Sequence, residues 1–234
     1  MFVPFFIIVF FVQGLVFGQD EEDCYSLYPY DEVEEADGIP DAEQLALVCP
    51  EVMKYIVCEE KRSYSTQDGN ELDPYIVSNK ALVIDLCNNT SKLHKAYLNS
   101  IECFRSMVDE WPSCRKIGQE VYVEFYNLKN NVQVSEEDLD IEEKDEFELH
   151  EHMEPMCLIT GHSLSCISIK ILETCGLEAH ETYVELVRRS KFMSWHCSRT
   201  TTNTLRNEFF EFLKFNKEEE QIDIFRSVFE FRKR

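Results

Sequence analysis

Glycine and proline are scarce in this chain. Only seven of each occur among 234 residues. Tight turns between β-strands depend on these two residue types, so the shortage disfavours a fold that is built from many hairpins. The composition therefore favours helices.

Basic residues are also few. The chain has 23 lysines and arginines against 45 aspartates and glutamates, which gives a formal net charge of −22. Nucleic acid is not an expected partner, because binding to phosphates needs a basic surface. Attachment to anionic lipid is disfavoured for the same reason. The acidic surface favours solubility.

The apolar run over residues 2–17 contains no charged residue. Small residues at Val16 and Gly18 predict a secretory signal peptide over residues 1–18, with cleavage before Gln19. A signal anchor is the alternative, because the run approaches the roughly 17–25 residues that span a bilayer. An acidic flank follows, and no second run is long and apolar enough to span a membrane. We therefore expect a secreted, extracellular protein that leaves the membrane after cleavage.

Closely spaced cysteines are absent. At least eight residues separate any two of them, whereas zinc sites use pairs such as C-x2-C. An even count of ten behind a signal peptide predicts about five disulfides, and the sequence leaves their pairing open. The cysteines are Cys24, Cys49, Cys58, Cys87, Cys103, Cys114, Cys157, Cys166, Cys175 and Cys197.

A spacing of nine recurs among these cysteines, from Cys49 to Cys58, from Cys157 to Cys166 and from Cys166 to Cys175. Nine steps of about 100° place two side chains on opposite faces of a helix. Such cysteines cannot bond to each other within one helix. Each is therefore predicted to link its helix to a different neighbour.

Helical periodicity recurs along the chain. Asp41 and Gln44 have the spacing of a helix cap, and Pro50 is expected to kink or restart the helix that follows. Gly176 is expected to end one helix before another begins. Residues 59–74 predict a polar loop, and the alternation over 121–125 would also suit a strand. Helical spacing is found in residues 83–87, 93–108, 117–128, 164–175, 177–187, 205–213 and 222–229.

These patterns predict an all-α fold, a disulfide-stapled helical bundle. After the signal peptide we expect an acidic flexible arm over 19–40, a cysteine-rich helical domain over 41–200 and an aromatic-rich helical segment over 201–234. Residues 135–155 contain eleven acidic side chains. They predict a solvated loop that divides the domain into halves.

Two patterns look like enzyme sites. The motif ITGHSLS resembles the nucleophile elbow of lipases, with Ser163 as the nucleophile. Its second glycine is replaced by Ser165, and no succession of buried strands precedes it, so a helix that starts after Gly161 is preferred. Cys197 follows His196, but a disulfide is favoured over a reactive thiol. No catalytic residue is predicted, and we expect a protein that is not an enzyme.

The acidic run also contains weak metal patterns. A calcium-binding loop that starts at Asp138 needs glycine at its sixth position and an acid at its twelfth, where Glu143 and Leu149 stand. His150 and His152 lack a third fixed ligand and are expected to be solvent-exposed. No metal and no cofactor are predicted.

The sequence NNTS contains two overlapping N-glycosylation sequons. Their acceptors are Asn88 and Asn89, with Thr90 and Ser91 as the hydroxyl residues. In an exported protein, one of these asparagines is expected to carry a glycan at the surface.

The aromatic C-terminal segment has two interpretations. Its two amphipathic stretches, 205–213 and 222–229, would suit contact with a membrane, and the second ends in basic residues. Acidic residues lie between the aromatic ones and oppose an anionic surface. Aromatic stripes that face a protein core are therefore preferred.

Two segments, LNSIECFRSMVDEWPSC and MEPMCLITGHSLSCISIKILETCGLEAHETYVELVRR, resemble secreted cysteine-rich helical domains of nematodes and arthropods, grouped as domain of unknown function 19. The likeness rests on helical cysteine spacing and on the phrase CG-x-E-A over residues 175–179. It covers roughly residues 45–200. The acidic run and the aromatic tail have no counterpart. The resemblance implies an extracellular helical architecture and transfers no activity.

The expected function is that of a secreted, non-enzymatic binding protein, which carries a small apolar ligand within the helical bundle. The alternative is a secreted interaction protein, such as a venom, haemolymph or cuticle component, that acts on a protein partner. The C-x3-C spacing of insect odorant-binding proteins is absent, which disfavours that family. No residue is assigned to ligand contact.

Overall fold

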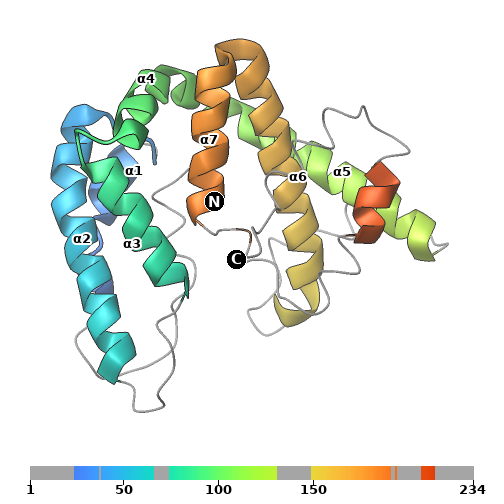
Figure 1. The fold of residues 1–234 in the computed structure, drawn as a ribbon. Helices are drawn as coiled ribbons and strands as arrows, with labels where there is room; N and C mark the ends of the chain where they lie inside the picture. The colour runs from blue at the N-terminus through green and yellow to red at the C-terminus, as the bar shows by residue number, and fades with distance from the viewer. Residues whose placement is uncertain are drawn as a thin grey trace. The chain divides into compact units, whose positions relative to one another are not determined.

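A computed structural model describes residues 24–36, 38–65, 74–130, 149–190, 193 and 207–213. All regular structure in these ranges is helical, which confirms the all-α fold class (Figure 1). The chain forms two compact units. Unit 1 consists of Met1–Ser106 and Cys175–Lys191, and unit 2 consists of Met107–Thr174 and Phe192–Arg234.

The first described segment differs from its prediction. The acidic arm expected over 19–40 is, where it is described, a 3-10 helix η2 (Cys24–Leu27) followed by α1 (Tyr30–Glu35). Val33 and Ile39 are buried, and Cys24 is bonded to Cys58. The segment is rich in acidic residues, and its few apolar residues show no clear periodicity in the sequence. These few residues are enough to pack the segment once the disulfide holds it in place.

Helix α2 (Ala42–Ser65) starts at the predicted cap. Asp41 Oδ1 accepts hydrogen bonds from the backbone N–H groups of Glu43 and Gln44, each at 3.0 Å, and Gln44 Oε1 accepts one from the Asp41 N–H at 3.0 Å. This reciprocal arrangement satisfies backbone donors at the helix start. The Gln44 N–H, above all, stabilises the carboxylate and lowers the pKa of Asp41.

Helix α2 is also longer than expected. It continues through Pro50 to Ser65, so the helix does not restart at Pro50, and the loop predicted over 59–74 is wrong as far as Ser65. A proline inside a helix removes one backbone hydrogen bond. The adjacent Cys49 is bonded to Cys87, and Val48 and Val52 are buried on either side. Packing and the disulfide thus outweigh the tendency of Pro50 to interrupt the helix.

Three further helices complete unit 1. They are α3 (Pro74–Cys87), α4 (Lys92–Ser106) and α7 (Leu177–Ser190). Helix α3 packs against α2, α4 and α7, and α4 also packs against α7 (Figure 1). Gly176, with φ of 85°, separates α6 from α7 as predicted. The core of the unit includes the buried side chains of Ile56, Leu82, Phe104 and Leu186.

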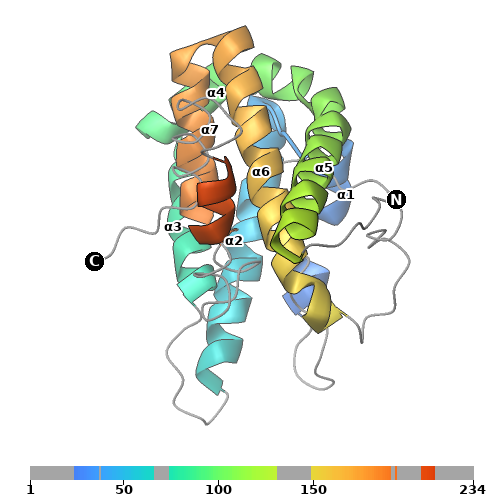
Figure 2. The ribbon, with the colours of Figure 1, turned by 90° about the vertical axis from the view of Figure 1, so that its right-hand side faces the viewer.

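Unit 2 contains η3 (Val108–Glu110), α5 (Trp111–Asn130) and most of α6 (Leu149–Cys175). Figure 2 shows α5 and α6 side by side. Helix α5 begins with Trp111 and Pro112. Proline is tolerated in the first turn of a helix, where its missing N–H group would have no partner within the helix. The strand alternative over 121–125 is excluded, since these residues are helical.

The acidic loop predicted over 135–155 ends earlier than expected, because α6 begins at Leu149. Residues 135–148 lie outside the described ranges. The two units divide at Ser106, Thr174 and Lys191 rather than within this acidic run.

The disulfides follow the prediction that was made from the nine-residue spacing. Cys49 and Cys58 lie on α2 and bond to different partners, as do Cys166 and Cys175 on α6. Cys157 is also disulfide-bonded, whereas Cys197 lies outside the described residues. The described bridges are Cys24–Cys58, Cys49–Cys87, Cys103–Cys175 and Cys114–Cys166.

The described part of the aromatic tail packs into a core. Residues 207–213 are helical, and Phe209 and Leu213 are buried. The rings of Phe125 and Phe209 meet edge to face, with centroids 5.1 Å apart. This packing confirms the core-facing interpretation for the first stretch, while the second lies outside the described residues. None of the described helices has both the length and the hydropathy to cross a membrane.

Candidate functional site

Ser163 does not occupy a nucleophile elbow. It lies inside α6, which begins at Leu149, so the helix start predicted after Gly161 is also wrong. The hydroxyl of Ser163 is fully buried and donates to the backbone oxygen of Ile159 at 2.7 Å. An elbow needs a sharp turn between a strand and a helix. The continuous helix supplies no such turn.

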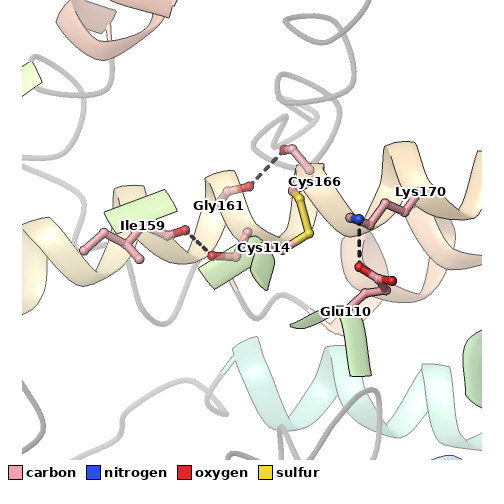
Figure 3. The surroundings of a disulfide bond; sticks show 8 residues. Glu110, Cys114, Ile159, Gly161, Cys166 and Lys170 are labelled. Atoms are coloured by element: carbon pink, nitrogen blue, oxygen red, sulfur yellow. Dashed lines mark hydrogen bonds and ion pairs between the residues drawn. A yellow bond between two sulfur atoms is a disulfide. The ribbon is translucent and has the colours of Figure 1, made fainter. Parts of the chain in front are cut away.

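The surroundings of Ser163 instead serve close packing between α5 and α6. A Cβ atom at Gly118 of α5 would lie 2.9 Å from the Ile159 oxygen and 3.0 Å from Ser163 Oγ. Figure 3 shows the Cys114–Cys166 disulfide between these helices. The serine and the glycine therefore account for a tight helix crossing.

A better candidate is Asn79 on α3. Its side chain is 2% exposed, and neither the amide oxygen nor the amide nitrogen has a hydrogen-bond partner in the described structure. An unsatisfied buried polar atom costs roughly 1–3 kcal/mol, so a native protein rarely retains one without a reason. The Asn79 amide thus offers N–H donors and a carbonyl acceptor to a bound molecule.

Two other buried polar residues lie at the same end of unit 1. Glu59 on α2 is 3% exposed, and Ser190 on α7 is 1% exposed. Their positions along the helices can be inferred from ion pairs between neighbouring residues. The carboxylate of Glu60 pairs with the ammonium of Lys80 at 2.7 Å, which places the preceding residues, Glu59 and Asn79, at one level of α2 and α3.

Helix α7 is held in register with α3 in the same way. The guanidinium of Arg189 donates to the Ala81 backbone oxygen at 2.9 Å and pairs with the Asp85 carboxylate at 2.8 Å. Ser190, the next residue, therefore lies on the turn of α7 that is held against α3. We call Glu59, Asn79 and Ser190 the polar end of the core.

Apolar side chains neighbour these residues along the helices. On α3, Leu82, Val83 and Leu86 follow Asn79 at helical spacing, and all three are buried. Leu186 of α7 and Ile56 of α2 are buried as well. A molecule with an apolar body and a polar head matches this distribution of side chains.

The burial of Asn79 was not predicted, although the sequence contains a pattern that indicates it. Asn79 precedes Leu82, Val83 and Leu86 by three, four and seven residues, which places it on the core face of α3. Glu59 was missed because it was assigned to a loop. Its burial becomes apparent only because α2 continues to Ser65.

His180 on α7 is a second polar group of unit 1 without a partner. Both ring nitrogens are enclosed and make no hydrogen bond in the described part of the chain. Loss of solvation lowers the pKa of His180 below its usual value, and the charge of Glu181 opposes this shift. The folded protein therefore favours the neutral ring.

This shift predicts a loss of stability on acidification. Because the folded pKa is lower, the unfolded chain takes up the proton first as the pH falls through about 6.5. The wild-type free energy of unfolding should then fall between about pH 7.5 and pH 5 by more than that of His180→Leu. Urea denaturation at both pH values measures this difference, and equal losses in the two proteins would contradict it.

The metal patterns of the acidic run find no support in the described residues, among which no group of three histidine, cysteine or acidic side chains could hold a metal ion. Positions 138–148 of the calcium-loop pattern lie outside the described ranges. His150 and His152 lie on α6, but their side chains are not described, so their predicted exposure stays a prediction.

Both predicted glycosylation acceptors lie at the surface. Asn88 and Asn89 are exposed in the short link between α3 and α4, directly after the disulfide-bonded Cys87. Thr90 is exposed as well, and Ser91 is half-buried.

The chain matches no protein-family model, no curated protein and no solved structure. The resemblance to domain of unknown function 19 therefore stays a prediction. Function must be argued from the residues of the chain.

Proposed function

We propose that this is a secreted, non-enzymatic binding protein, and that unit 1 carries a small apolar molecule with a polar head group. The observation that carries the proposal is the buried, unpartnered amide of Asn79 beside an apolar core. Hydrogen bonds to the head group would satisfy that amide, while burial of the apolar body would drive association.

Charge favours certain head groups. The chain has a formal net charge of −22, which disfavours an anionic head group such as a carboxylate. A hydroxyl avoids this repulsion and can both donate to and accept from the amide, and a protonated amine avoids it and donates to the amide oxygen. The proposed ligand is therefore an apolar alcohol or amine rather than a fatty acid.

Export forms part of the same proposal. Disulfides persist in oxidising compartments, and four bridges are described in this chain. The uncharged apolar run over residues 2–17 supports a signal peptide that is cleaved after Gly18. The exposed sequons at Asn88 and Asn89 would then meet the glycosylation machinery.

The substitution Asn79→Leu tests the ligand site. It replaces the unpartnered amide by an apolar group of similar size, so we expect the free energy of unfolding to rise by about 1–3 kcal/mol. Affinity for decanol should fall at least tenfold, because the hydrogen bonds to the head group are lost. Urea denaturation measures the stability, and titration calorimetry on the oxidised protein measures the affinity.

Ser168→Ala provides a matched control in unit 2. The hydroxyl of Ser168 is also fully buried without a partner in the described structure, so this variant removes an equivalent group away from the proposed site. Its affinity for decanol should equal that of the wild type, and decanoic acid should bind the wild type more weakly than decanol. If decanol fails to bind the wild type, or binds Asn79→Leu equally well, the carrier proposal is wrong.

A further inference from the structure

The two sequons in the link between α3 and α4 differ in the hydrogen bonds of their hydroxyl residues. Asn88 forms a local turn with Thr90. Its side-chain oxygen accepts a hydrogen bond from the Thr90 backbone N–H at 3.0 Å and one from the Thr90 hydroxyl at 2.7 Å. The acceptor amide and the hydroxyl of the first sequon are thus in contact, and the two residues are exposed.

The second sequon lacks this arrangement. Its hydroxyl belongs to Ser91, which caps α4. Ser91 Oγ accepts a hydrogen bond from the His94 backbone N–H at 3.0 Å and donates to the Asp85 backbone oxygen at 2.5 Å. This hydroxyl is already engaged by two backbone groups of the fold.

We infer that Asn88 carries the N-linked glycan and that Asn89 remains unmodified. The bonds between Asn88 and Thr90 span only two residues, so they can form in a nascent chain before the helices pack. A glycan on the Asn88 nitrogen leaves the bonds to its side-chain oxygen intact. It also leaves the cap formed by Ser91 in place.

A glycan on Asn88 would lie near an exposed apolar side chain. Ile84 is 46% exposed in the last turn of α3, and Asn88 follows the end of this helix directly. A glycan on Asn88 would stand beside this exposed apolar side chain and shield it from other proteins.

Two hydroxyl variants separate the sequons, because each removes one and keeps the other. Thr90→Ala destroys the Asn88 sequon and preserves Asn89-x-Ser91, while Ser91→Ala does the reverse. Each full-length protein would be secreted from eukaryotic cells and its intact mass measured before and after enzymatic deglycosylation. We expect the glycan mass to disappear in Thr90→Ala and to remain in Ser91→Ala.

Asn88→Gln and Asn89→Gln serve as a second pair, since both retain the Ser91 cap. The glycan should be lost in the first and kept in the second. A glycan on Asn89, or one that persists in both hydroxyl variants, overturns the inference. The inference rests on the proposed export, and the outcomes remain distinguishable. Secreted wild-type protein without a glycan overturns the inference alone, whereas protein retained inside the cell with its leader uncut overturns both.

Discussion

Loss of the Cys103–Cys175 disulfide is expected to lower the free energy of unfolding by about 3 kcal/mol, an estimate from loop entropy. This bridge joins α4 to the end of α6, next to the start of α7. Its 72-residue separation encloses the Cys114–Cys166 bridge, which shortens the loop that it closes in the unfolded chain to roughly 20 residues. The double substitution Cys103→Ser with Cys175→Ser, followed by urea denaturation, measures the loss.

The matched control is the double serine variant of Cys24 and Cys58, whose separation is 34 residues. No other described bridge lies wholly inside this loop, so the same entropy estimate predicts a slightly larger loss for the control, by roughly half a kcal/mol. If the Cys103–Cys175 variant loses clearly more stability than this control, loop closure is not the main contribution of the bridge.

Gly118→Ala is expected to destabilise unit 2 by about 1–3 kcal/mol, the usual cost of overpacking a core. Helix propensity alone predicts the opposite sign, since alanine is favoured over glycine by about 1 kcal/mol in a helix interior. The new Cβ would stand 2.9 Å from the backbone oxygen of Ile159. A backbone atom cannot rotate away as a side chain can, so α5 and α6 must separate. The midpoint of urea unfolding measures the effect.

Ser113→Ala provides the control, because Ser113 is exposed on the same helix, α5. A substitution at such a surface position should change stability by no more than about 0.5 kcal/mol. A Gly118→Ala protein that is more stable than the wild type would show that α5 and α6 adjust without cost, contrary to the packing described here.

Some features of the fold could be predicted because they depend on geometry within one segment. The nine-residue spacing of Cys49 and Cys58 predicted different partners, since the helix alone determines which face each cysteine occupies. The cap formed by Asp41 and Gln44 was predicted for the same reason. Gly176 also ends α6 through a local property, its left-handed backbone.

Other features of the fold depend on contacts between residues far apart in the sequence, and they could not be predicted from local patterns. The helix through Pro50 and the packing of the acidic segment after Cys24 are supported by disulfides whose partners could not be read from the chain. The candidate site was missed in a similar way. Glu59 lies on the part of α2 that extends past its predicted end, and the Glu60–Lys80 pair places this part beside the segment of α3 that carries Asn79.

Native mass spectrometry of the wild-type protein, secreted from eukaryotic cells, tests the carrier proposal most directly. Spectra would be recorded before and after organic extraction, with Asn79→Leu prepared in parallel. The account predicts that the wild type carries a releasable apolar alcohol or amine and that Asn79→Leu carries much less of it. If both proteins have the same bound mass, or if the wild type is empty and takes up no added decanol, unit 1 is not a carrier of the proposed kind.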